Sequence, residues 1–580
     1  MAKDQKLQLD RRGLLLGSGA ALAGGMMAAT TPAVAKSARS WDRETDIIAI
    51  GGGAAGLTAA VTAAADGADV VVLEALPMVG GTTAKSGGVF WIPNNYTLRE
   101  KGIEDKKEDC MRYMCRFSYP ELYHPDQPFF GLAEPDYRRL EAFYDHGSPM
   151  ADHLRSLGAL KMREWRMWTI DVSAPDYQSE MPENKVPTGR PLVAALDDGS
   201  TGQGSDLTSQ LEAWLLARGV PVLTNHRVAK LIQEDGRVIG VEATHKGETV
   251  AIKARRGVIF GTGGYAHNPH LIRRHQPAFI HGSCAQAGAR GDFVTLGASV
   301  GAQLGNMGNA WRTSCVLEQA LRNRILGWAT FFVPGDSMFF VNKFGQRVVN
   351  EKRNYNDRTE VQLAFNANTA DYPNLLLFMI YDQRTADLLA GQFPYPKSGE
   401  EHYVIKADDW DSLAEKIDAR LASHAKDIGG IRLAPDFGEN LKTTAKRFNG
   451  FAKKGVDEDF KRGGFDYDRV WERAFAIKNT DTSWSAADAE PNNTMHALQK
   501  KGPYYAIIMG HGALDTNGGP VINEHAQVLD YQDQPIPGLF GAGNCIANPS
   551  RHAYFGAGGT IGPAMTFGYI AAKTALAETS

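Results

Sequence analysis

The chain has 580 residues, 43% of them hydrophobic, and a formal net charge of −4 at pH 7. A chain of this length is expected to fold around more than one hydrophobic core, as two or more interleaved domains. Its charge is small and forms no long run of one sign, so it has no electrostatic footprint for a nucleic acid. The composition predicts a globular protein without a nucleic-acid partner.

The N-terminal segment is expected to be a targeting signal. Arg11 and Arg12 precede a weakly apolar stretch, rich in alanine and glycine, that ends in the A-x-A type cleavage site Ala33-Val34-Ala35. A transmembrane anchor is the alternative, but glycines and Pro32 interrupt the stretch and make it a poor span. We therefore predict a twin-arginine signal peptide over residues 1–35, export to the periplasm or beyond, and no transmembrane span.

A βαβ unit opens the mature chain. Residues 46–50 are a short, β-branched run typical of a buried parallel strand, residues 54–65 predict a helix, and residues 70–73 predict a second buried strand. The turn after the first strand has the motif G-x-G-x-x-G over residues 51–56. Glu74 follows the second strand, where an acidic side chain hydrogen-bonds ribose hydroxyls. The unit predicts a dinucleotide site.

The three motif glycines have separate physical roles. Gly51 permits the tight turn, Gly53 lets the backbone approach a pyrophosphate, and Gly56 allows close packing of the helix on the strand. The N-terminus of the helix presents free N–H groups to the phosphates.

Three further glycine-rich segments favour FAD over a nicotinamide dinucleotide. They are residues 80–88, residues 261–264 after a predicted strand, and residues 538–564, which lead into a helix whose N-terminus can face a reduced flavin. Each alone could be an ordinary turn, but together and in this order they predict an extended FAD. The predicted FAD-binding residues are Gly51, Gly53, Ala54, Ala55, Gly56, Glu74, Ala75, Gly81, Thr82, Thr83, Ser86, Gly87, Gly88, Val228, Thr262, Gly263, Gly264, Gly543, Asn544, Thr560 and Ile561.

The composition divides the mature chain into three parts. Residues 36–310 carry the first glycine motifs and residues 488–580 carry the last. Between them, residues 311–487 are rich in aromatic, charged and helix-forming residues. We therefore predict an α/β fold in which a Rossmann-like FAD-binding domain is interrupted by an inserted α+β substrate domain.

Three motifs carry a family resemblance: SGGVFWIPNN at residues 86–95, GPYYA at residues 502–506 and YFGAGGTIGPAMTFG at residues 554–568. With them the mature chain resembles the fumarate reductase and succinate dehydrogenase flavoprotein superfamily, and most of all its 3-ketosteroid Δ1-dehydrogenase branch. The resemblance implies a dehydrogenase that desaturates a steroid or similarly flat, apolar ketone and passes electrons to a quinone or cytochrome. Residues 80–88 lack the histidine to which succinate dehydrogenases attach FAD, which implies non-covalent FAD. Residues 96–144 depart from the family pattern and are expected over the substrate entrance.

The resemblance also assigns catalytic roles. A tyrosine at the position of Tyr355 takes a proton from the carbon α to the ketone, while hydride from the neighbouring carbon passes to flavin N5. The Tyr554 hydroxyl and the Gly558 N–H would hold the ketone oxygen as it gains enolate character. A third tyrosine assists the base, and the alignment leaves Tyr177 and Tyr144 open, with Tyr177 favoured. For each tyrosine, a core residue with a bonded hydroxyl is the alternative.

Fumarate and succinate are not expected as substrates. Residues 339–351 match a hairpin and Asn-Glu motif of the superfamily, after which fumarate reductases place an arginine where this chain has Tyr355. A second arginine, expected in the terminal glycine motif, is also absent. A dicarboxylate needs cationic, bidentate partners, for which Arg353, Arg358 and Arg551 remain. A periplasmic ene-reductase of the fumarate or urocanate reductase type is the alternative function.

The cysteines and histidines give weaker signals. The five cysteines form no C-x-x-C-H haem motif, and whether Cys110 pairs with Cys115 stays open. No metal-ligand spacing occurs. His267, His511 and His552 could carry protons, although surface or core histidines are the commoner outcome.

Overall fold

The computed structural model describes residues 39–578 except Trp168, residues 399–400 and residues 476–490. The signal peptide predicted over residues 1–35 lies outside the described residues. Within them, no helix is both long enough and apolar enough to cross a membrane. From Trp41 onward the chain forms one compact unit.

The first sheet is built around the predicted βαβ unit. Its strand order is β20-β21-β11-β1-β2-β8, with β10 paired to β11 and β9 paired to β10. The central pairs β1–β2, β1–β11 and β11–β21 are parallel. The strands are β1 (Arg43–Ile50), β2 (Val70–Leu73), β8 (Val222–Leu223), β9 (Arg227–Glu234), β10 (Arg237–His245), β11 (Glu248–Phe260), β20 (Gln527–Leu529) and β21 (Pro535–Gly541).

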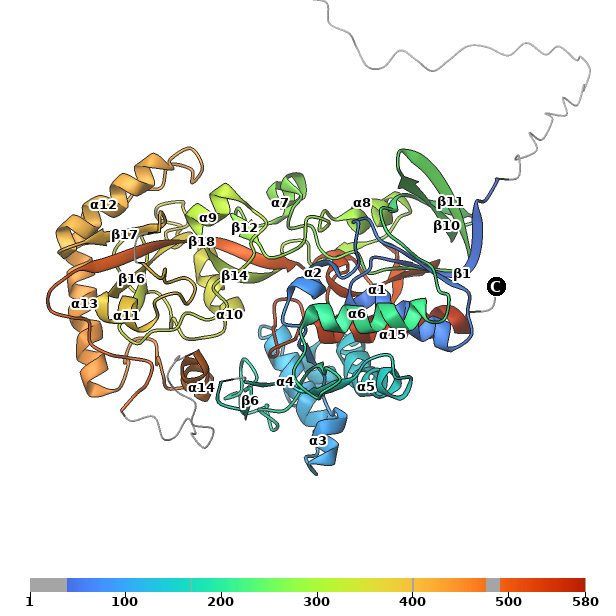
Figure 1. Cartoon of the computed structure of the whole chain (residues 1–580), viewed down its shortest axis with the longest axis horizontal. Coiled ribbons are helices and arrows are strands. Elements are labelled where there is room, and N and C mark those ends of the chain that lie inside the picture. The colour runs from blue at the N-terminus through green and yellow to red at the C-terminus, as the bar shows by residue number, and fades with distance from the viewer. Residues whose placement is uncertain (1–38, 168, 399–400, 476–490, 579–580) are drawn as a thin grey trace, which may run out of the picture. The chain divides into compact units, whose positions relative to one another are not determined.

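Two helices of small residues lie against this sheet. Helix α1 (Ala54–Ala65) and helix α15 (Ile561–Ala577) come from opposite ends of the chain and lie beside each other (Figure 1). A Cβ at Gly568 would lie 2.4 Å from the Ala55 carbonyl oxygen, so the two helices can approach this closely only with glycine at that position. This packing brings the first and last glycine motifs together.

The second sheet has six strands and a long central strand, β18, that is almost wholly buried. Helices α12 (Trp410–Ser423) and α13 (Phe437–Lys454) pack their apolar faces against this sheet (Figure 1). The order is β12-β18-β16-β15, and β14 and β17 also pair with β18. The strands are β12 (Gly282–Ser283), β14 (Ala310–Val316), β15 (Met338–Val341), β16 (Leu376–Asp382), β17 (Val404–Ala407) and β18 (Tyr504–Thr516).

The second sheet does not coincide with the segment predicted as an inserted domain. That segment, residues 311–487, supplies β15, β16, β17 and most of β14, whereas β12 and β18 lie outside it. Composition could not reveal this, because β18 lies in a stretch that carries glycine motifs and is placed in the sheet only by pairing with distant strands. Because residues 41–580 form one unit, the predicted boundaries stay predictions.

Helices α4 (Lys107–Ser118) and α5 (Glu134–Ser156) form a separate layer. Cys110 and Cys115 both lie on α4, are buried and are unpaired, as are the other three cysteines. The Tyr113 hydroxyl of α4 donates to the Phe555 carbonyl at 2.7 Å. This layer therefore contacts the last glycine motif, residues 554–568.

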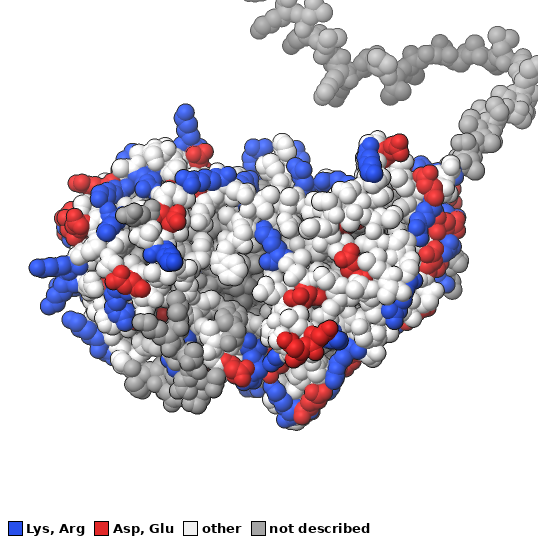
Figure 2. Space-filling view, in the orientation of Figure 1, with Lys and Arg blue, Asp and Glu red and all other residues white. Residues whose placement is uncertain are grey.

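Basic and acidic side chains are interspersed on the face that Figure 2 displays.

Candidate active site

One cavity brings together almost all of the predicted site residues. Tyr177, Tyr355, Tyr554 and Gly558 line it together with the predicted FAD-binding residues, except for Gly56 and Gly264. Those lining residues are Gly51, Gly53, Ala54, Ala55, Glu74, Ala75, Gly81, Thr82, Thr83, Ser86, Gly87, Gly88, Val228, Thr262, Gly263, Gly543, Asn544, Thr560 and Ile561.

The first glycine motif fits a dinucleotide pyrophosphate. Gly53, the N-cap of α1, has an ordinary φ of −87°, and a Cβ there would meet no protein atom closer than 3.6 Å. Its missing side chain therefore leaves open the space that a phosphate needs. A Cβ at Gly56 would lie 1.9 Å from the Gly51 carbonyl oxygen, so Gly56 serves helix-to-strand packing. The N–H group of Gly264 donates to Asp515 at 2.8 Å, and Gly264 does not line the cavity, so its contact with FAD stays a prediction.

Glu74, the residue predicted to bind the ribose, lines the cavity, but its carboxylate already accepts hydrogen bonds from the backbone. Its oxygens accept hydrogen bonds from the N–H groups of Gly52 and Leu76, both at 2.7 Å. Burial raises the pKa of Glu74, and these N–H donors oppose that effect. A carboxylate retains lone pairs beyond two bonds, so Glu74 fixes the glycine turn and is still able to accept a bond from a ribose.

The second glycine-rich segment, residues 80–88, contains a short helix. Helix α2 (Gly81–Lys85) starts after Gly80, whose φ of 107° turns the chain. The Thr83 hydroxyl accepts from the Ala54 N–H at 3.2 Å, which ties α2 to the start of α1. Ser86, Gly87 and Gly88 follow in the cavity wall, which also includes Ile561, the first residue of α15.

Three tyrosine hydroxyls from distant parts of the chain gather in the cavity. The Tyr177 hydroxyl donates to the Tyr355 hydroxyl at 3.1 Å. Tyr554 stacks on Tyr177 at 5.0 Å and meets Tyr355 edge-on at 5.3 Å between ring centroids. Tyr144 instead donates to the Asp105 carbonyl and does not line the cavity. The geometry thus selects Tyr177 over Tyr144 as the partner of Tyr355.

Backbone contacts hold the tyrosines in register. Tyr355 is the first residue of α10 (Tyr355–Thr359), whose N-cap Asn354 accepts from the Asp357 N–H at 3.0 Å. The Tyr177 N–H donates to the Phe555 carbonyl at 3.0 Å, which joins the Tyr177 segment to the terminal motif.

Burial disfavours ionisation of these phenols. It is the largest cause that raises the pKa of Tyr355 well above its usual range, and the neighbouring Tyr177 and Tyr554 add to the effect. Burial raises the pKa of Tyr554 as well, although its contact with Tyr355 opposes the shift. Tyr355 therefore rests as a neutral phenol at neutral pH, and accepting a proton requires that its own be passed on.

Gly558 presents a backbone N–H to the same cavity. Its φ is 88°, and a Cβ there would lie 2.5 Å from the backbone of Phe90. The Gly558 carbonyl accepts from the N–H groups of Trp91 and Gly562, whereas its own N–H has no acceptor among the described residues. Only glycine allows this approach, which leaves the Gly558 N–H available as a hydrogen-bond donor.

Aromatic side chains that the sequence did not single out also line the cavity. Phe331 meets Tyr355 edge-on at 5.4 Å, and Phe332 stacks on Phe475 at 5.1 Å. The helical spacing of Trp471 and Phe475 was the available signal, since both lie on one face of α14 (Asp466–Phe475). Besides the tyrosines, the aromatic wall residues are Trp165, Phe260, Trp311, Trp328, Phe331, Phe332, Phe393, Trp471 and Phe475.

No described residue between 90 and 164 lines the cavity. The segment 96–144, expected over the substrate entrance, is therefore not part of the cavity wall.

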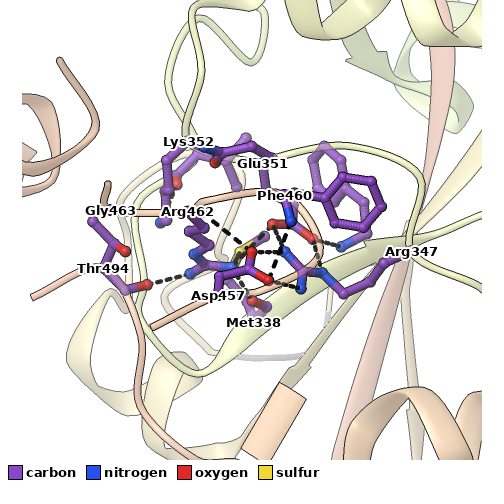
Figure 3. Close-up of polar contacts among 12 residues, drawn as sticks. Met338, Arg347, Glu351, Lys352, Asp457, Phe460, Arg462, Gly463 and Thr494 are labelled. Carbon is purple, nitrogen blue, oxygen red and sulfur yellow. Dashed lines mark hydrogen bonds and ion pairs between the residues drawn. The ribbon is translucent and has the colours of Figure 1, made fainter. Parts of the chain in front are cut away.

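A buried cluster of charges anchors the segment that leads to Tyr355. Arg347 pairs with Glu351 at 2.8 Å and with Asp457 at 2.9 Å, and Arg462 reaches Glu351 at 3.3 Å (Figure 3). Burial alone would raise the pKa of Glu351, but the two guanidinium groups outweigh it and the net shift is downward. The carboxylate therefore stays ionised and holds the chain four residues before Tyr355.

Removing the charge of Glu351 is expected to destabilise the fold. In Glu351→Gln two buried guanidinium groups lose a carboxylate, and breaking a buried pair costs about 3 to 5 kcal/mol. The matched control is Glu121→Gln, which breaks an exposed pair with Arg551 and is expected to cost at most about 1 kcal/mol. Denaturant unfolding of the two variants measures both values, and equal losses would contradict the anchoring role.

The three arginines that remained as candidate partners for a dicarboxylate substrate do not line the cavity. Arg353 pairs with Asp468 at 3.5 Å, Arg358 donates to the Arg353 carbonyl at 3.0 Å, and Arg551 pairs with Glu121 at 2.6 Å. Among the described lining residues there is no arginine. The cavity thus offers no pair of cations for a dicarboxylate.

The histidines considered as proton carriers lie outside the cavity wall. His511 contacts Arg312 at 3.0 Å, and burial, with that cation, lowers its pKa to about 3. His267 makes a 2.8 Å contact with the Ala285 carbonyl. Neither these residues nor His552 lines the cavity, and no group of acidic, histidine and cysteine residues suited to a metal occurs in the described part of the chain.

A dinucleotide site that shares its cavity with clustered tyrosines and aromatic walls defines a flavin-dependent oxidoreductase. The chain belongs to the FAD binding domain family, whose model matches residues 46–561. It is an FAD-dependent oxidoreductase that acts on CH–CH groups, of the ketosteroid and oxocyclohexane dehydrogenase type.

Two relatives match nearly the whole chain. The 3-oxosteroid 1-dehydrogenase of Mycolicibacterium smegmatis is 30% identical, with 91% of this chain and 97% of that protein covered. The 4-oxocyclohexanecarboxylate 2-dehydrogenase of Sinomonas cyclohexanicum is also 30% identical, with 91% and 92% covered. They confirm the predicted relationship and the FAD-dependent dehydrogenase class.

The fold is also that of a solved structure. The 3-ketosteroid Δ1-dehydrogenase from Sterolibacterium denitrificans aligns with a TM-score of 0.74 over 92% of this chain and 100% of that one, at 24% identity. The predicted α/β, Rossmann-like FAD-binding fold is thereby confirmed, and the additional domain contains a second sheet.

Proposed function

We propose that the protein removes two hydrogens from adjacent carbons beside the ketone of a flat cyclic substrate. The observation that carries the proposal is the 3.1 Å contact between Tyr177 and Tyr355, with Tyr554 and Gly558 in the same cavity as the FAD site. The aromatic walls suit a flat apolar ring. The 3-oxosteroid and oxocyclohexane substrates named for the relatives supply the two ring sizes to test.

The ketone oxygen is held by two donors. The Tyr554 hydroxyl and the Gly558 N–H bind it and stabilise the negative charge that it gains as the neighbouring carbon loses a proton. Because a ketone acidifies the carbon beside it, a tyrosine positioned there is able to act as the base.

Tyr355 takes that proton and Tyr177 orients the base. Tyr355 acts as the base in its phenolate form, to which the Tyr177 hydroxyl donates a hydrogen bond, and the proton taken from the substrate carbon restores the neutral Tyr355 phenol. When bound, FAD supplies the acceptor for the hydride of the adjacent carbon. Electrons then leave to an external acceptor, for which a quinone or a cytochrome is the proposed class.

The FAD is proposed to be bound without a covalent link. Helix α2, which lies in the cavity wall, consists of Gly, Thr, Thr, Ala and Lys and offers no histidine. Held by backbone N–H groups and glycine turns, the cofactor needs no covalent attachment.

The test is turnover with an artificial electron acceptor over a panel of 3-ketosteroids, substituted cyclohexanones and succinate. We expect activity with cyclic ketones and none with succinate. Activity with succinate alone, or fumarate reduction without ketone oxidation, would favour the ene-reductase alternative instead.

Loss of one donor to the ketone oxygen is expected to slow turnover. In Tyr554→Phe the Gly558 N–H remains, so the rate of flavin reduction should fall by about 10². The affinity for the ketone should fall too, since a bond made in the ground state is lost. Single-turnover kinetics at several ketone concentrations separate the two effects, and wild-type values for both would remove Tyr554 from the site.

Export through the twin-arginine route is proposed from the residue pair Arg11 and Arg12 and the site Ala33-Val34-Ala35. Arg11→Lys combined with Arg12→Lys is expected to leave the protein in the cytoplasm. Cell fractionation with an antibody measures the location. Unimpaired export of the double variant would show that another signal is used.

A further inference from the structure

Lys85 is a cation in the cavity wall that the proposed reaction does not use. It is the last residue of α2, directly before Ser86, and it lines the cavity. Its ammonium nitrogen is buried and has no hydrogen-bond partner among the described residues. Buried polar groups in proteins are normally satisfied, so this nitrogen calls for a ligand.

Lys85 lies near Cys284, which also lines the cavity. The Cys284 thiol is close enough to influence its ionisation. Cys284 belongs to an apolar cluster against which Phe331 packs, and Phe331 meets Tyr355 edge-on. Lys85 therefore lies near a group of packed side chains that extends through Phe331 to Tyr355.

The link to that side is fixed by the backbone. The Gln286 N–H, two residues after Cys284, donates to the Thr82 hydroxyl of α2 at 3.0 Å. Helix α2, which ends at Lys85, is thus attached to the segment that carries the thiol.

The acidic residues of the cavity wall are engaged elsewhere. Glu74 accepts from two backbone N–H groups, and Asp292 pairs with Arg227. Asp515 accepts from the N–H groups of Gly264 and Thr516. Among the described lining residues, Lys85 is the one lysine or arginine. The wall therefore has a single cation without a carboxylate of its own.

Energetics favour an anionic ligand at this point. Burial lowers the pKa of Lys85 from its ordinary value, which reflects the cost of a charge without a counterion. A carboxylate brought in by the ligand offsets that cost through a charge-assisted hydrogen bond in a site with aromatic walls. One cation matches one carboxylate and leaves the second carboxylate of a dicarboxylate without a partner.

We propose that the cyclic ketone substrate also carries a carboxylate, and that Lys85 binds it. This inference rests on the proposed function and adds the substrate class, a keto acid whose ketone lies at Tyr554 and Gly558 while its carboxylate meets Lys85. The ring lies between them, against the aromatic wall.

The test compares each keto acid with its own methyl ester. Two matched pairs are used: a cyclohexanone with a carboxylate on the carbon opposite the ketone, and a 3-ketosteroid with a side-chain carboxylate. The readout is the ratio of kcat/KM for acid over ester in the FAD-loaded protein. In Lys85→Met that ratio is expected to fall by about 10- to 100-fold, the usual contribution of a charged hydrogen bond.

Two further variants separate charge from structure. Lys85→Arg keeps the cation and should retain most of the preference for the acid. Lys416→Met removes an exposed lysine of α12 and should leave the ratio unchanged. FAD content and affinity are measured for each variant.

The outcomes distinguish the inference from the proposed function. A ratio that is the same in wild type and Lys85→Met overturns the assignment, and so does a variant that loses FAD with no change in ratio, because Lys85 then binds the cofactor. If neither the keto acids nor their methyl esters reduce the flavin, the proposed function itself fails.

Discussion

Replacing Tyr355 with phenylalanine is expected to slow flavin reduction by about 10² or more, the usual contribution of a general base. The substitution removes only a hydroxyl, so the edge-on packing against Phe331 and Tyr554 should survive and FAD should remain bound. Single-turnover reduction by the best ketone measures the effect. A wild-type rate in Tyr355→Phe would make Tyr355 an ordinary core tyrosine.

The pH dependence gives a second readout for the same residue. Because burial and the neighbouring phenols raise the pKa of Tyr355, the neutral form dominates at neutral pH and the fraction able to accept a proton grows as pH rises. The rate of flavin reduction by wild type should therefore increase toward alkaline pH. Tyr355→Phe should lose this increase, whereas loss of packing alone would lower the rate equally at every pH.

Adding one methyl group at Gly53 is expected to weaken the affinity for FAD strongly without unfolding the protein. The φ of −87° suits any residue, and the added Cβ would lie 3.6 Å from the Thr83 hydroxyl, an ordinary contact. The methyl group would occupy the space of a phosphate, so we expect the Kd of Gly53→Ala for FAD to rise by about 10², roughly 2.7 kcal/mol.

A matched control separates cofactor binding from folding. Gly450 lies within α13, where an added Cβ would meet nothing within 4 Å, so Gly450→Ala should bind FAD as the wild type does. Titration of the apoproteins with FAD gives the affinities, and circular dichroism reports the fold. Normal FAD affinity in Gly53→Ala would mean that the pyrophosphate lies elsewhere.

Local sequence patterns were sufficient for the start of the fold. The helix predicted over residues 54–65 and the strand predicted over residues 70–73 have the same bounds in the structure, because an apolar run, a glycine turn and small helix residues all act within one βαβ unit. The make-up of the second sheet was not predicted, because β18 pairs with strands up to hundreds of residues away in the chain.

The candidate site was predicted unevenly for a similar reason. The glycines of the FAD site follow from backbone requirements that sequence displays directly. The tyrosines depended on family resemblance, and the choice between Tyr177 and Tyr144 required the contact with Tyr355. No sequence motif marks the burial of Lys85 or the aromatic side chains of the cavity wall. Both features arise only when segments distant in sequence pack around one cavity.

The most direct measurement of the central claim is an anaerobic single turnover of the FAD-loaded protein with a cyclic ketone. We expect the absorbance of the oxidised flavin to bleach. One equivalent of the α,β-unsaturated ketone should form per flavin. A flavin that stays oxidised with every ketosteroid and oxocyclohexane tested, but is bleached by succinate, would contradict the account.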